Sequence, residues 1–156
     1  MKILFTNLIA VLISISAYSQ TILNGKIIAV ADGDTFTMLT EGNKQVKIRL
    51  HGIDCPEKRQ DFGTAAKTYT STQVFNKVVI ARVLKKDQYK RFIAIVILPN
   101  GKILNEELLR AGMAWHYKKY DQSTKFASLE AIAKKNKTGL WRGYKPIAPW
   151  EFRKLR

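Results

Sequence analysis

The chain has 156 residues, of which 46% are hydrophobic, enough for one compact domain with a core and too few for two large ones. Its 27 lysines and arginines against 12 aspartates and glutamates give a formal charge of +15, which is typical of proteins that bind polyanions. A single cysteine, Cys55, excludes an intramolecular disulfide, so the fold must rely on its core.

Residues 1–19 are predicted to form a signal peptide. Lys2 precedes an apolar run from Ile3 to Ile15, and the small residues Ala17 and Ser19 follow it, so we expect cleavage after Ser19. A membrane anchor is the alternative, but about 13 apolar residues interrupted by polar ones fall short of the roughly 20 that a spanning helix needs. We therefore expect a secreted or periplasmic protein without stable membrane association after cleavage.

Cleavage would remove one lysine and no acid, which leaves 26 basic side chains against 12 acidic ones and a formal charge of +14. Such a field attracts polyanions by releasing their condensed counterions, nucleic acid above all, although an anionic cell surface would attract the chain as well. The sequence does not indicate an oligomer, so we expect a monomer.

In chain order the expected elements are strands over 25–31, 35–40 and 46–51, a helix within 63–76, strands over 78–84 and 91–98, a helix capped by Asn105 and ended by Gly112, and a helix capped by Asp121 or Ser123 that runs to Lys137. They predict a mainly β protein with helices (α+β), a five-stranded OB-fold β-barrel with three packed helices. The domain would span 20–156, with a core of about 25–141. The basic tail, 142–156, has no periodicity and either docks as irregular structure or hangs loose.

Alternation in the third strand separates a core face from a polar face. Apolar side chains occupy every second position, which places Arg49 off the core face. Pro56 cannot continue a β-ladder, so residues 54–57 should leave the sheet as a turn that exposes Glu57 near the strand end.

Acids and arginines gather at the predicted strand ends, in the order Asp32, Asp34, Arg49, Asp54, Glu57 and Arg91. Carboxylate oxygens are hard ligands that suit calcium or magnesium, and the planar guanidinium fork suits phosphate. Taken singly, each motif is also an ordinary turn, cap or surface ion pair. Their joint occurrence predicts a metal and phosphate site.

The chain resembles the staphylococcal nuclease (thermonuclease) family over about residues 25 to 141, through Asp32-Gly33-Asp34-Thr35, Ile48-Arg49-Leu50, Ile53-Asp54-Cys55-Pro56-Glu57, Asp87-Gln88-Tyr89-Lys90-Arg91, Leu104-Asn105-Glu106-Glu107-Leu108 and Gly139-Leu140-Trp141. The resemblance implies an OB-fold barrel with three helices that hydrolyses DNA and RNA with one calcium ion and leaves 3′-phosphate ends. We expect little sequence specificity, because no motif would read base edges.

The resemblance also implies roles for individual residues. Asp34 and Asp54 would bind calcium through their carboxylates, and Cys55 would bind it through its main-chain carbonyl. Arg49 and Arg91 would hold the scissile phosphate.

Glu57 is the candidate general base, which would take a proton from an attacking water. Asp32 would support the metal ligands without binding the cation itself.

The substrate-binding residues are carried over less completely. Tyr89 matches a substrate-side tyrosine of the family, and Lys90 beside it would steer the polyanion. Tyr117 and Tyr120 are candidates for a pair of tyrosines that stacks on nucleotides in the family. The best-known member has threonine at the position of Cys55, which matters little if only the carbonyl binds metal, and glycine at that of Lys90, which bears on the backbone shape of that loop.

Three other interpretations stay open. A noncatalytic OB-fold domain that binds nucleic acid would explain the barrel and the charge. A cationic protein that acts on anionic surfaces would explain the charge alone. A catalytic thiol at Cys55 would need His51 or His116 as its base, since the chain has no other histidine.

Overall fold

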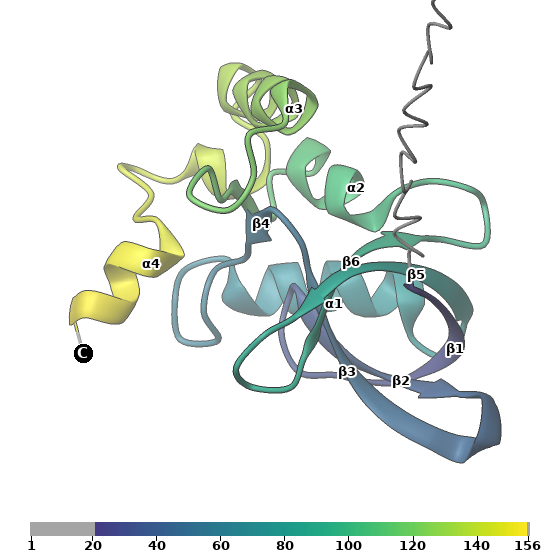
Figure 1. Ribbon diagram of the computed structural model, residues 1–156. Coiled ribbons are helices and arrows are strands. Elements are labelled where there is room, and N and C mark those ends of the chain that lie inside the picture. Colours follow the sequence, from purple (N-terminus) through teal and green to yellow (C-terminus); the bar gives the residue numbers. More distant parts are fainter. Residues whose placement is uncertain (1–20, 156) are drawn as a thin grey trace, which may run out of the picture.

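The computed structural model describes residues 21–155 (Figure 1). The predicted signal peptide, 1–19, lies outside this range. In the part of the chain that is described, no helix is long and apolar enough to cross a membrane.

Five strands close into a barrel with the order β1-β2-β3-β6-β5 (Figure 1). They are β1 (Thr21–Val30), β2 (Thr35–Thr40), β3 (Lys44–Leu50), β5 (Val78–Lys86) and β6 (Phe92–Ile97). The strands β3 and β6 pair in parallel, and all other neighbours in the barrel are antiparallel. The predicted α+β class and the five-stranded barrel are confirmed.

The barrel interior is filled by the apolar half of each alternating strand. In β3, Ile48 and Leu50 are buried while Lys47 is exposed, as the alternation requires. The remaining interior side chains come from all four other strands, among them Ile27, Phe36, Met38, Val79, Ala81, Ala94 and Val96. The polar side chains at the strand ends are thereby held at the rim of a packed barrel.

Within residues 21–155, four α-helices and three short 3₁₀ turns accompany the barrel: α1 (Gly63–Val74), α2 (Leu104–Arg110), α3 (Thr124–Lys135), α4 (Pro149–Phe152), η1 (Glu41–Asn43), η2 (Gly139–Arg142) and η3 (Arg153–Leu155). The first three helices correspond to the expected ones. Ser123 caps α3 by accepting a hydrogen bond from the backbone N–H of Phe126. The fourth helix lies in the tail, for which the sequence predicts no regular structure.

Two local expectations were wrong. Residues 54–57 leave the barrel sheet, but not as a turn from Asp54 on, because β4 (Ile53–Asp54) pairs with β7 (Trp115–His116) in a separate two-stranded sheet before Pro56 ends the pairing. Asn105 does not cap α2, which begins at Leu104.

Buried inside α2, the Asn105 amide accepts from the Val96 N–H and donates to the His51 and Ala94 carbonyls. It ties the helix to the residue after β3 and to the middle of β6, where the parallel pairing of β3 with β6 ends at Leu50 and Ala94.

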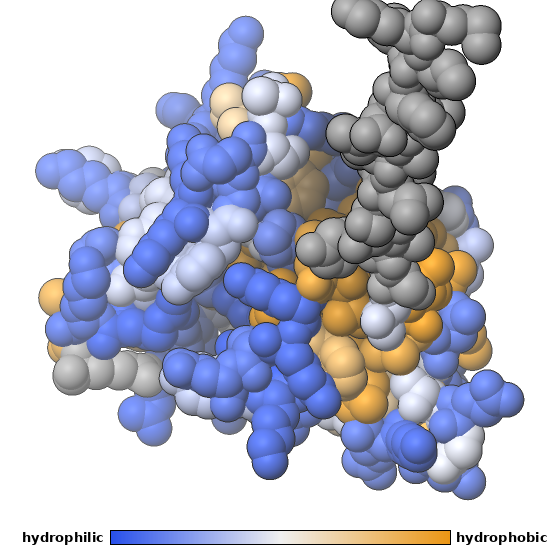
Figure 2. All heavy atoms as spheres, in the orientation of Figure 1, coloured by the Kyte–Doolittle hydropathy of each residue, from blue (hydrophilic) through white to orange (hydrophobic). Residues whose placement is uncertain are grey.

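The surface in Figure 2 is largely hydrophilic, with hydrophobic side chains gathered over β1 and β5. The exposed apolar residues of these two strands are Ile22, Val78, Ile80 and Leu84. The chain has 27 lysines and arginines and a formal charge of +15, which agrees with the hydrophilic character of the rest of this face.

Candidate functional site

A hollow of about 920 Å³ lies at one end of the barrel. Its walls come from the β1–β2 turn, the end of β3, β4, the β5–β6 loop and the C-terminal tail. The predicted site residues that line it are Asp32, Asp34, Arg49, Asp54, Cys55, Glu57, Tyr89, Arg91, Tyr117 and Tyr120. Lys90 is the one predicted site residue outside this lining. Segments far apart in the sequence thus meet around one cavity.

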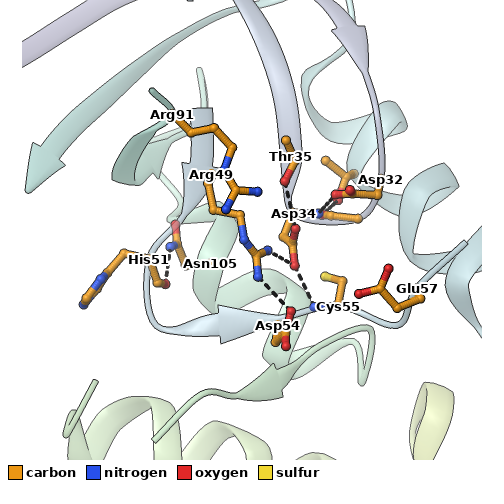
Figure 3. Close-up of polar contacts among 12 residues, drawn as sticks. Asp32, Asp34, Thr35, Arg49, His51, Asp54, Cys55, Glu57, Arg91 and Asn105 are labelled. Carbon is orange, nitrogen blue, oxygen red and sulfur yellow. Dashed lines mark hydrogen bonds and ion pairs between the residues drawn. The ribbon is translucent and has the colours of Figure 1, made fainter. Parts of the chain in front are cut away.

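Arg49 lies between two buried carboxylates (Figure 3). Its Nη2 donates to Asp54 Oδ1 at 2.7 Å, and its Nη1 forms an ion pair with Asp34 Oδ2. The side chains of Asp34 and Asp54 are only 6% and 2% exposed, so ionised carboxylates there would be costly without a partner. Arg49 therefore draws the two predicted metal ligands together.

One backbone N–H and one hydroxyl orient the Asp34 carboxylate. The N–H of Cys55 donates to Asp34 Oδ2 at 2.7 Å, and Thr35 Oγ1 donates to Oδ1 at 3.1 Å. Asp32 Oδ1 accepts from the backbone N–H of Asp34 at 3.1 Å, as in an Asx turn. A side chain at Gly33 would place its Cβ 2.7 Å from that of Cys55, so the close approach of the two segments requires glycine.

Arg153 enters the hollow from the C-terminal tail, and sequence reasoning missed it. Its Nη2 donates to Asp54 Oδ2 at 2.8 Å, and its Nη1 donates to Glu57 Oε1 at 2.6 Å. Desolvation acts to lower the pKa of Arg153, but the hydrogen bonds to both carboxylates outweigh it and raise that pKa. The only signal in the sequence is a basic ending after Trp150, which gives no hint of a contact 96 to 99 residues away.

Arg91 lines the hollow but is held by its own loop. Its Nε and Nη2 both lie 2.8 Å from Asp87 Oδ2, and the backbone N–H groups of Tyr89 and Arg91 donate to Oδ1. Desolvation acts to raise the pKa of Asp87, whereas these hydrogen bonds, with the Arg91 charge, lower it below its ordinary value. The guanidinium is thus fixed in direction by a carboxylate that stays ionised.

Aromatic side chains form one side of the hollow. Tyr117 and Tyr120 meet edge to face with ring centroids 4.7 Å apart, and Trp150 of α4 stacks on Tyr117 at 4.8 Å. Tyr89 is 68% exposed on the opposite loop. An adjoining hollow of about 400 Å³ shares Tyr117 with the first, and Trp150 and several lysines also line it. Stacking surfaces beside cations suit single-stranded nucleic acid.

Lys90 stands apart from the other predicted substrate residues. It is exposed and adopts a left-handed backbone conformation with φ of 61°. The best-known family member has glycine at this position. Glycine adopts such a φ without strain, whereas lysine does not.

The histidines and the thiol do not form a nucleophile and base. His51 Nε2 and His116 Nε2 lie 3.1 and 2.9 Å from the two oxygens of Asp121. Figure 3 shows the His51 ring turned away from the carboxylate group. Burial raises the pKa of the Cys55 thiol well above its ordinary value, so the thiol stays protonated. This geometry does not support a catalytic thiol.

The donor set for a metal ion is small. Within residues 21–155, no group of three or more His, Cys, Asp or Glu side chains is placed to hold one. Asp34 and Asp54 supply hard oxygens, which suit calcium better than a soft metal. With so few protein ligands, a calcium site here would be a weak one.

The chain is similar to proteins named as nucleases. The model of the family described as staphylococcal nuclease homologue matches residues 47–143. An uncharacterized endonuclease of Haemophilus influenzae is 38% identical over 153 residues, 98% of this chain and 85% of its own. An uncharacterized endonuclease of Escherichia coli is 35% identical over 84% of this chain and 85% of its own. A staphylococcal-like nuclease of Arabidopsis thaliana is 37% identical over 71% of this chain and 34% of its own.

Proposed function

Because the chain belongs to the family of staphylococcal nuclease homologues, we propose that it is an endonuclease that hydrolyses phosphodiester bonds of DNA and RNA. The resemblance inferred from its motifs is confirmed. The observation that carries the proposal is the arrangement of Arg49 between Asp34 and Asp54, with Glu57 at the edge of the same hollow. The fold alone would not suffice, since OB-folds also serve as noncatalytic binding domains.

We propose that Arg49 and Arg91, which both line the hollow, hold the scissile phosphate. A phosphodiester resists attack because negative charge grows on its oxygens as a nucleophile adds. Arg49 and Arg91 stay protonated and can each donate two hydrogen bonds to such oxygens. Both are directed by carboxylates, Arg49 by Asp34 and Asp54 and Arg91 by Asp87, so little orientation has to be gained when substrate binds.

Glu57 is the proposed general base. It would take a proton from a water whose oxygen bonds to phosphorus, while the bond from phosphorus to the 5′-oxygen breaks and that oxygen takes up a proton. The products are a 3′-phosphate and a 5′-hydroxyl. A positioned general base contributes a factor of about 10² to 10⁴ in rate.

Calcium is the proposed cofactor. Asp34, Asp54 and the main-chain carbonyl of Cys55 would hold it, with Asp32 supporting the turn that carries Asp34. When bound, the ion would supply positive charge to the phosphate and the attacking water. Two carboxylates make a weak site, which suits a compartment rich in calcium. A secreted or periplasmic location is proposed on the leader-like sequence at 1–19.

Single-stranded polynucleotide is the proposed substrate form. Tyr89, Tyr117 and Tyr120 offer stacking faces around the hollow, and Lys85 lines it as a further cation. Stacking and phosphate contacts tolerate any base, so little sequence specificity is expected. The noncatalytic alternative would use the same surface for binding alone.

The test is cleavage of single-stranded DNA by residues 20–156, with calcium or with excess chelator. We expect calcium-dependent products whose new ends carry 3′-phosphate. Glu57→Gln should lower the rate by about two orders of magnitude, as expected when a general base is lost. Glu41→Gln, on an exposed turn outside the hollow, is the control that should cleave at the normal rate. If the protein binds DNA but does not cleave it at any calcium concentration, the enzyme hypothesis is wrong and the noncatalytic binding domain is favoured.

A further inference from the structure

The C-terminal tail places a cation at the acids that are proposed to bind calcium. Arg153 Nη2 lies 2.8 Å from Asp54 Oδ2, and Nη1 bridges Asp54 Oδ1 at 3.4 Å and Glu57 Oε1 at 2.6 Å. One guanidinium thus spans a proposed metal ligand and the proposed base. No part of the proposed reaction requires this contact.

Both oxygens of Asp54 are occupied in this arrangement. Oδ1 accepts from Arg49 at 2.7 Å, and Oδ2 accepts from Arg153. The Asp54 side chain is 2% exposed, so solvent does not offer another approach to its oxygens. A divalent cation needs at least one of them and would repel a guanidinium at the same oxygen.

Arg49 and Arg153 differ in how easily they can leave. Arg49 is 13% exposed and pairs with two buried carboxylates, whereas Arg153 is 42% exposed and pairs with one buried carboxylate, Asp54, and with Glu57, which is 32% exposed. Moving Arg153 into solvent leaves its backbone anchored, because Trp150 stacks on Tyr117 and meets Trp115 edge to face at 5.7 Å. A swing of one side chain therefore suffices.

We infer that Arg153 is a positioning residue that holds Asp54 and Glu57 in the cation-free protein and that Arg153 and the divalent cation exclude each other at Asp54. This inference rests on the proposed function for the identity of the cation site. The tail would then raise the calcium concentration that the protein needs, because each calcium ion has to displace the Arg153 guanidinium from Asp54. By linkage, the cation weakens the Arg153–Asp54 pair as much as the pair weakens cation binding.

The first test is calorimetric titration of calcium into the mature protein without substrate. Arg153→Gln should bind calcium about three- to tenfold more tightly, the scale of a partly exposed ion pair. Lys154→Gln is the matched control, because it removes the same charge from the next residue, whose partner is Glu151. Its affinity should stay within about twofold of the normal protein, as a distant exposed charge contributes little.

A second readout is thermal unfolding with and without saturating calcium. Arg153→Gln should be less stable than the normal protein without calcium, and the gap should shrink when calcium is present. Arg153→Lys keeps the charge but cannot bridge two carboxylates as a planar fork, so it should bind calcium with intermediate affinity.

The outcomes separate this inference from the proposed function. Suppose that the normal protein binds calcium and that Arg153→Gln and Arg153→Lys bind it equally or more weakly. Arg153 and the cation would then not compete for Asp54, while the proposed calcium-dependent nuclease would be unaffected. Failure of all variants and the normal protein to bind calcium would overturn both.

Discussion

The rim of the barrel and the C-terminal tail both contribute charged side chains to the hollow, but different contacts hold those side chains in place. At the rim, the Cys55 backbone N–H and the Thr35 hydroxyl donate to Asp34, and Arg49 near the end of β3 pairs with both Asp34 and Asp54. In the tail, Arg153 depends on two carboxylates from another segment and on one aromatic stack. The rim is therefore the stable part of the site, and the tail is the part that can change at small cost.

Substitution of Arg49 tests the rim and should have the largest effect. Arg49→Gln leaves Asp34 without its ion pair and weakens that of Asp54, so we expect a loss of about 3 kcal/mol in the free energy of unfolding. Urea denaturation at neutral pH measures it. Lys47→Gln, exposed on the same strand, should change stability by less than about 0.5 kcal/mol. A small loss in Arg49→Gln would show that the rim does not need its buried pair.

Removal of the aromatic anchor tests the tail. Trp150→Ala deletes the stack on Tyr117 and the contact with Trp115, so a loss of about 1 to 2 kcal/mol is expected, less than at the rim. The same variant should bind calcium more tightly, because Arg153 loses its support. Tyr144→Ala, with an exposed fraction of 91%, is the control for both measurements. A loss equal to that of Arg49→Gln would erase the difference between the two regions.

The Asp87 carboxylate holds Arg91 and its loop at the rim, and its contribution to stability depends on pH. Its pKa is lowered in the folded protein from the ordinary value of 3.8, so its contribution is complete above that value and is lost as pH falls through the native pKa. Asp87→Asn should therefore be less stable than the normal protein near neutral pH, and the gap should close in strong acid.

Urea midpoints measured from neutral pH down to strong acid provide the test. Asp61→Asn, at an exposed position outside the hollow, is the control. A gap that does not depend on pH would show that the Asp87 charge does not hold the Arg91 loop.

The strands and the main helices follow from local patterns. Alternation in 46–51 placed Arg49 off the core face, and Ser123 was among the expected caps, because both depend on residues within one turn or one strand. Asn105 shows where local reasoning fails. Its amide satisfies backbone groups of β3 and β6, so a residue that locally favours a helix start lies inside the helix instead.

The barrel and the acids and arginines at strand ends can be predicted from the sequence, because period-two alternation and turn residues act over a few positions, and the family follows from short motifs. Which of these charges touch depends on the tertiary fold. It joined Asp34 and Asp54 through Arg49, closed Arg91 onto Asp87, and brought Arg153 to Asp54 and Glu57 from a tail without periodicity. The physical reason is that an ion pair forms wherever the fold brings opposite charges together, at any separation along the chain.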